Sequence, residues 1–186
     1  MNVLAYYTDR MEPLTSEKGI TEQALVLRRG KTMRPRTIAD GRAMLVDLGT
    51  QFVGGDILKR QNGEQYFIIS KQQSSDCVQM QGKRVNAYIT IRTLADKYVN
   101  HKKVGTEEKT IAENCPTYYQ DVSAAMHTYD AGLLPKTVKK IIIHNSVPVK
   151  LLDRVSFGER DYQIDNIDTA KYVGLYELQL SEDTRQ

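Results

Sequence analysis

Histidine, cysteine and paired carboxylates are the side chains most often used for catalysis or metal binding, and this sequence has few of them at useful spacing. Its three histidines, His101, His127 and His144, are next to no serine elbow, cysteine nucleophile or zinc-binding helix motif. The two cysteines, Cys77 and Cys115, belong to no CxxC motif, and we predict that both are buried or half-buried free thiols. We therefore expect no enzyme activity, no metal site and no cofactor.

Asp56 and Asp153 resemble a catalytic acid pair only in residue type. Each stands just before a predicted hairpin, where an aspartate commonly accepts hydrogen bonds from neighbouring backbone amides. The Gly54-Gly55 pair before Asp56 lacks the glycine spacing and the following helix of a phosphate-binding loop. We interpret both features as structural.

A basic run near the N-terminus is the clearest candidate for partner contact. Five cations fall within nine residues without an acidic neighbour: Arg28, Arg29, Lys31, Arg34 and Arg36. Such a run suits an acidic protein surface or a phosphate backbone, and it equally suits a solvated, flexible arm. An apolar patch at 3–7, which includes Tyr6 and Tyr7, is a second candidate for docking.

Composition limits the class of protein. The chain has 186 residues and a net charge of +3, which is too weak to require a polyanionic partner. No run approaches the roughly 20 apolar residues of a membrane-spanning helix, and the N-terminus lacks the features of a signal peptide. We expect a protein made in a cytoplasm, without membrane contact, that contains two domains of modest size.

The elements that position these residues are mostly strands. Residues 55–70 predict a hairpin, because Asn62-Gly63 separates two apolar runs and tolerates the positive φ of a type I′ or bulged turn. Alternating apolar residues at 85–91 predict a further strand. Residues 37–92 are therefore expected to form a first module of four or five strands.

A second module is expected over residues 138–186, where the order of features is repeated. Asp56 falls on Asp153 with a shift of 97 positions, and the same shift places 44–46 on 141–143. After the turn the shift is 96, which places Tyr66 on Tyr162. This order predicts two similar modules, although recurrent hairpin patterns alone can produce it.

Two regions are less regular. Residues 1–36 are expected to form an N-terminal arm, and 93–137 a mixed connecting segment. The spacing within 117–129 permits either a helix or a strand. The predicted fold is mainly β, with two small antiparallel barrel-like modules, an extended arm and a mixed middle segment. We expect the arm and middle segment to carry partner contacts, and the chain to remain folded without residues 1–36.

The order of these features resembles structural proteins of the tailed-bacteriophage neck, the head-tail connector or head-closure group. The resemblance covers residues 40–181 and rests on three stretches: the hairpin at 55–70, Cys115-Pro116-Thr117-Tyr118, and the segment from Asp153 to the strand at 174–178. These are strand patterns, and none of them is a catalytic motif. The chain is longer than the familiar single-barrel stopper proteins of that group.

The resemblance implies a small β-barrel subunit of the virion neck that forms a ring with copies of itself. Its implied partners are portal or adaptor proteins, tail proteins and packaged DNA in the channel, and it implies no active-site residues. Two alternatives remain open from the sequence. One is a small-barrel nucleic-acid-binding protein that uses Arg28 to Arg36, and the other is a different phage tail or minor capsid protein.

Overall fold

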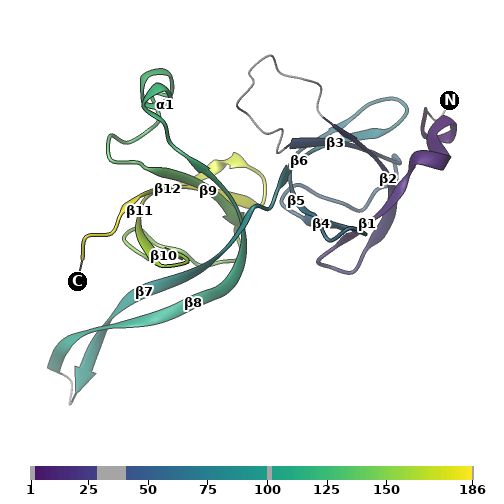
Figure 1. Cartoon of the computed structure of the whole chain (residues 1–186). Coiled ribbons are helices and arrows are strands. Elements are labelled where there is room, and N and C mark those ends of the chain that lie inside the picture. The colour runs from purple at the N-terminus through teal and green to yellow at the C-terminus, as the bar shows by residue number, and fades with distance from the viewer. Residues whose placement is uncertain (1–2, 29–40, 100–101, 186) are drawn as a thin grey trace. The chain divides into compact units, whose positions relative to one another are not determined.

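Two closed, six-stranded antiparallel β-barrels make up the computed structural model of this chain (Figure 1). The structure describes residues 3–28, 41–99 and 102–185. By its internal contacts the chain divides into two units. The first comprises residues 1–85 and 172–174, and the second comprises 86–171 and 175–186.

The first barrel uses six consecutive strands in the spatial order β1-β2-β3-β6-β5-β4, and β1 closes it against β4 through the pair Leu14 and Arg60. A short 3₁₀ helix, η1, precedes the barrel at Val3–Arg10. The strands are β1 (Glu12–Ser16), β2 (Thr21–Arg28), β3 (Gly41–Val46), β4 (Ile57–Arg60), β5 (Gln65–Gln73) and β6 (Val78–Arg84).

The second barrel has the order β10-β11-β12-β9-β8-β7, and β7 closes it against β10. A helix, α1 (Ala124–Tyr129), follows β8 and is capped by the Ser123 side chain. The strands are β7 (Ala87–Val99), β8 (Lys102–Asp121), β9 (Lys139–His144), β10 (Arg154–Phe157), β11 (Arg160–Tyr172) and β12 (Leu175–Glu182).

The two barrels have the same topology, which confirms the predicted repeat. Reading β7 to β12 as counterparts of β1 to β6 converts one strand order into the other. The registers agree as well: Met44 pairs with Met80 in the first barrel, and its counterpart Ile141 pairs with Leu178 in the second. The segments 44–46 and 141–143 are therefore equivalent strands.

The hydrophobic cores share equivalent positions in the two barrels. Leu58 and Tyr66 are buried in the first core, and their counterparts Val155 and Tyr162 are buried in the second. Each core has its own set of apolar side chains. Burial of these alternate residues is the main favourable contribution to folding of each barrel.

Asp56 and Asp153 fill the structural role that their positions predicted. Asp56 Oδ2 accepts a hydrogen bond from the Val53 amide at 2.9 Å, and Asp153 Oδ2 accepts one from the Lys150 amide at 2.7 Å. The two carboxylates lie in different barrels and each stabilises the turn before a hairpin.

The predicted hairpin turn at Asn62-Gly63 takes the bulged form. Gly63 has φ +85°, whereas Asn62 has no positive φ, so a type I′ turn is not present. The Gly63 amide donates to the Arg60 carbonyl at 3.0 Å, and the Asn62 side chain accepts from the Glu64 amide at 3.0 Å.

The boundaries of the modules differ from those expected. The N-terminal region is extended, but β1 and β2 belong to the first barrel, where Leu14 and Ala24 are fully buried. Residues 12–28 of the predicted arm are therefore part of the first barrel, and removal of residues 1–36 would open it. The first barrel ends at Arg84, and residues 87–92, expected within the first module, lie in β7 of the second barrel.

The middle segment is more regular than expected. Most of it belongs to the long strands β7 and β8, which close the second barrel. Within 117–129, the chain is a strand through Asp121 and a helix from Ala124, so each alternative holds for part of the range.

Candidate functional site

The two described histidines, His127 and His144, each make a local hydrogen bond. His127 Nε2 lies 3.0 Å from the Thr137 carbonyl oxygen, and His144 Nδ1 lies 2.7 Å from the Ser146 hydroxyl. His101 lies outside the described residues. Cys77 and Cys115 are buried free thiols, as predicted. Among residues 3–28, 41–99 and 102–185, no group of three or more His, Cys, Asp or Glu side chains is placed to hold a metal ion.

The sequence-predicted contact residues are separated in the structure. Tyr6 and Tyr7 lie on η1 with 65% and 37% of their surface exposed. Arg28 is the last residue of β2, where it pairs with Arg42 of β3. Arg29, Lys31, Arg34 and Arg36 lie outside the described residues.

One end of the first barrel is rich in cations. Because neighbouring strands are antiparallel, this end gathers the end of β2, the start of β3, the β4–β5 turn and the end of β6. We call it the basic end. Its described side chains include two carboxylates and four cations; these are Glu12, Glu64, Arg42, Arg60, Lys83 and Arg84.

An internal network uses part of this charge. Arg60 bridges Glu12 and Glu64, with nitrogen–oxygen distances of 2.8 and 2.6 Å, and the Tyr66 hydroxyl donates to Glu64 at 2.9 Å. Burial by itself would raise the pKa of Glu64, but hydrogen bonds from Asn62, Tyr66 and Arg60 outweigh it and lower the pKa to about 2. Glu12 and Glu64 therefore interact mainly with Arg60, whose side chain is 21% exposed, whereas the Arg84 side chain is 47% exposed.

The opposite end of the first barrel is rich in carboxylates. It gathers the β1–β2, β3–β4 and β5–β6 turns, and we call it the acidic end. Five carboxylates and two lysines lie there: Glu17, Glu22, Asp47, Asp56, Asp76, Lys18 and Lys71. Lys18 pairs with Asp56 at 2.7 Å, and the carboxylates of Glu22 and Asp47 lie beside η1.

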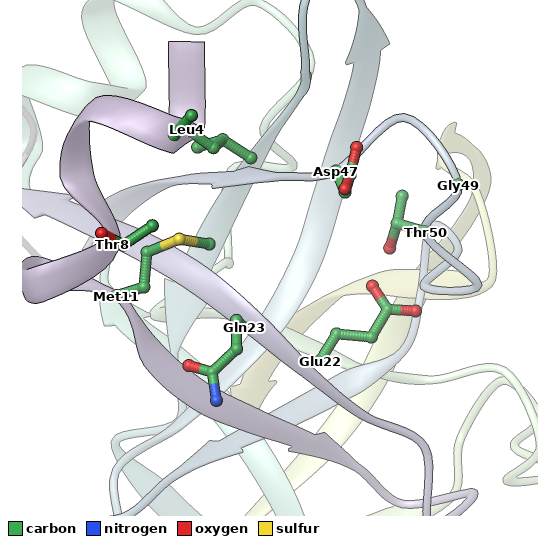
Figure 2. A pocket seen from close by; sticks show the side chains of 9 residues that line it. Leu4, Thr8, Met11, Glu22, Gln23, Asp47, Gly49 and Thr50 are labelled. Carbon is green, nitrogen blue, oxygen red and sulfur yellow. The ribbon is translucent and has the colours of Figure 1, made fainter. Parts of the chain in front are cut away.

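A hollow of about 580 Å³ opens at this acidic end, between η1, the start of β2 and the β3–β4 loop (Figure 2). On the η1 side its lining is largely apolar, with Leu4, Ala5 and Met11. On the other side lie the carboxylates of Glu22 and Asp47, which Figure 2 shows across the hollow from Leu4 and Met11. We call this feature the acidic hollow.

The walls of the acidic hollow are held in place. Leu4 is buried against Leu25 and Cys77, which attaches η1 to the barrel. Glu22 Oε1 accepts from the Gln51 amide at 2.7 Å, and Asp47 Oδ1 accepts from the Leu48 amide at 2.7 Å. The second oxygen of each carboxylate can accept a hydrogen bond from a cationic side chain. The hollow therefore combines an apolar floor with carboxylates that are held in place at its rim.

The second barrel contributes a different feature, a long two-stranded ribbon. Strands β7 and β8 continue beyond the barrel, as Figure 1 shows, and remain paired from Arg92 with Thr110 to Val99 with Lys102. We define the ribbon by its described residues, 92–99 and 102–113. Arg92 and Arg154 both pair with Glu108 at its base, and Arg154 pairs in turn with Asp183 at 2.7 Å.

The first barrel shows that the ribbon is an insertion. In the first barrel, four residues (17–20) separate Ser16, which pairs with Leu58, from Thr21. In the second barrel, twenty-two residues (92–113) separate the equivalent positions, Ile91 and Asn114. The first two strands of the barrel are thus joined by a tight turn in the first barrel and by the ribbon in the second.

The ribbon has open edges within the part of the chain that the structure describes. There, apart from their pairing with each other, β7 pairs only with β10, at residues 90–92, and β8 pairs only with β9, at residues 118–121. Sequence reasoning missed the ribbon because polar, charged residues dominate it. The available signal was the surplus length between 92 and 113 when the two modules are aligned.

Comparison of the chain with protein-family models, with curated proteins and with solved structures gives no match. No helix among the described residues is both long and apolar enough to span a membrane.

Proposed function

We propose that this chain is a non-enzymatic structural subunit that forms a ring with copies of itself at the head-tail junction of a tailed bacteriophage. The observation that carries the assembly role is the ribbon, which joins β7 to β8 in the second barrel. In the first barrel, a four-residue turn joins the equivalent strands β1 and β2. The resemblance of residues 40–181 to neck proteins supplies the location. Portal or adaptor proteins and tail proteins are the remaining proposed partners, and packaged DNA passes through the ring.

The physical argument for an assembly role starts from the cost of an isolated hairpin. A two-stranded ribbon without a third strand or a covering helix is marginally stable in water. Open strand edges also promote association with other chains. A chain that retains such a ribbon where four residues suffice gains a surface for a neighbour in return.

The chain itself provides the loop for a test. Residues 92–113 are replaced by residues 17–20, Glu-Lys-Gly-Ile, which close the first barrel at the equivalent place. The new glutamate lies opposite Arg154, so the shortened barrel retains a favourable pair at this site. We expect the full chain to form rings in negative-stain microscopy and native mass spectrometry, and the shortened chain to be folded but to form none.

A control variant with Lys109→Gln and Thr110→Val keeps the ribbon length and should still assemble. Rings of normal size from the shortened chain would contradict the assembly role of the ribbon. The location is tested separately, by gold-labelled antibody on purified particles. Label at the head-tail junction supports a neck protein, whereas label along the tail or on the capsid contradicts that position.

A second candidate is a small-barrel nucleic-acid-binding protein, and the basic end of the first barrel favours it. Such a protein would bind duplex DNA as a monomer, with an affinity that falls steeply as salt rises. Binding of DNA by the isolated chain without any self-association would favour this candidate over the ring subunit.

A further inference from the structure

We propose that the first barrel binds a second copy of the chain head to tail, with the basic end of one copy seated on the acidic hollow of the next. This inference rests on the proposed ring subunit and specifies one of its contacts. It predicts that cationic side chains from another copy occupy the acidic hollow.

The chemistry of the hollow fits lysine and arginine side chains. These side chains carry a long apolar stem and a charged head. In the hollow, a stem can pack against Leu4, Ala5 and Met11 while the head reaches the carboxylates of Glu22 and Asp47. The volume of about 580 Å³ admits more than one such side chain.

The basic end offers side chains of that kind. Lys83 and Arg84 end strand β6, and Arg42 lies at the start of β3. Arg84 lies 3.4 Å from Glu64 and its side chain is 47% exposed, so this contact leaves the guanidinium accessible. Arg60 is held by Glu12 and Glu64 and is excluded from the proposed contact.

The two complementary surfaces lie at opposite ends of one barrel. Residues Arg28 and Glu22 of the same strand β2 belong to the basic and the acidic end respectively, about 20 Å apart at the usual rise per residue of a strand. One copy therefore cannot satisfy both of its own ends. A contact of this kind is heterologous, and repeated contacts close into a ring when the rotation between copies allows it.

The acidic hollow favours a protein partner over nucleic acid. A phosphate backbone would use the basic end alone, and the carboxylates of Glu22 and Asp47 would repel it. A second copy uses both ends, and each end neutralises the charge of the other.

The test compares two variants of the full chain. The acidic-end variant carries Glu22→Gln and Asp47→Asn, which remove two charges but keep the oxygens that accept from Gln51 and Leu48. The basic-end variant carries Lys83→Gln and Arg84→Gln. Self-association is measured by sedimentation velocity at low ionic strength, and both variants should associate about tenfold more weakly than the unmodified chain.

Two control variants make the same charge changes in the second barrel. Glu159→Gln with Asp168→Asn matches the acidic-end variant, because Asp168 likewise accepts from backbone amides, at Ala170 and Lys171. Lys150→Gln with Arg160→Gln matches the basic-end variant. Both controls should associate as the unmodified chain does, and melting curves should show that all four variants are folded.

Mixing distinguishes head-to-tail contact from other geometries. An acidic-end variant still has an intact basic end, and a basic-end variant still has an intact acidic hollow. Equimolar mixing should therefore restore one contact and yield heterodimers, without the larger assemblies of the unmodified chain. An interface that uses the same surface on both copies would give no such recovery.

The outcomes separate this inference from the proposed function. If the unmodified chain forms rings and both variants form them equally well, the head-to-tail contact is wrong while the ring subunit stands. If the basic-end variant loses affinity for a fluorescent DNA duplex with no change in self-association, the basic end is a polyanion site instead. If the unmodified chain stays monomeric at every concentration, both proposals fail.

Discussion

Gly55 and Leu152 occupy the same position in two copies of one hydrogen-bonded turn, and both have a positive φ, +92° and +69°. The Gly55 amide donates to the Ile68 carbonyl at 2.8 Å, and the Leu152 amide donates to the Ile164 carbonyl at 2.8 Å. The turn therefore imposes the same left-handed backbone on a glycine and on a leucine. Only the glycine adopts it without steric cost.

Leu152→Gly should stabilise the second barrel. A non-glycine residue in the left-handed region costs roughly 1 to 2 kcal/mol. The Leu152 side chain is 56% exposed, so little burial is lost with it. We expect a gain of about 1 kcal/mol in the free energy of unfolding, measured by urea denaturation.

The control for this change is Leu152→Ala, which shortens the side chain but leaves the strain. Gly55→Ala is the reciprocal change and should destabilise the first barrel by about 1 kcal/mol or more. Equal effects of Gly and Ala at Leu152 would show that the backbone conformation is not the cause.

Asp153→Ala should destabilise the second barrel by about 2 kcal/mol, because the amide of Lys150 loses its hydrogen bond to the buried Asp153 carboxylate. Asp153→Asn keeps an accepting oxygen and should cost less. The same pair of changes at Asp56 should follow the same order, with an added loss of the exposed Lys18 pair. An alanine variant as stable as the asparagine variant would contradict the capping role.

Gly63→Val should destabilise the first barrel by about 1 to 2 kcal/mol, because a β-branched residue is strained at a φ of +85°. Gly63→Asn is the control, since asparagine tolerates this region better than valine. The midpoints of urea unfolding give the comparison. Identical midpoints for the glycine, asparagine and valine proteins would argue against the bulged turn.

The stability of the first barrel should fall as pH decreases from about 4.5 to about 2. The pKa of Glu64 is about 2 in the folded protein and 4.5 for an ordinary glutamate, so the unfolded chain takes up this proton first. The stabilisation by ionised Glu64 is complete above the higher value and is lost as pH approaches the lower one. Because the network is partly open to water, we expect about 1 to 2 kcal/mol.

Glu64→Gln should remove this part of the pH dependence, whereas the exposed control Glu113→Gln should retain it. Urea denaturation at pH 7, 5, 4 and 3 provides the comparison. A slope in the Glu64→Gln protein as steep as in the unmodified chain would mean that other carboxylates control the acid sensitivity.

Local signals in the sequence determined the hairpins and the repeat. Turn residues such as Asn62-Gly63, and the alternation of apolar side chains, act over a few neighbouring positions and can be recognised there. The shared order of strand, aspartate and hairpin then aligned Met44 with Ile141, and the structure places both in equivalent strands. The class of fold followed from these local patterns.

Only the tertiary structure decided which segments close each barrel and where the charges meet. Leu14 joins the core by pairing β1 with β4, and such pairing between distant segments leaves no local pattern in Glu12–Ser16. Likewise, Glu22 lies on β2 and Asp47 in the β3–β4 loop, and they lie beside one hollow only because the barrel closes. The ribbon was hidden for a related reason: polar and charged residues dominate its sequence, which lacks the apolar alternation that identifies buried strands.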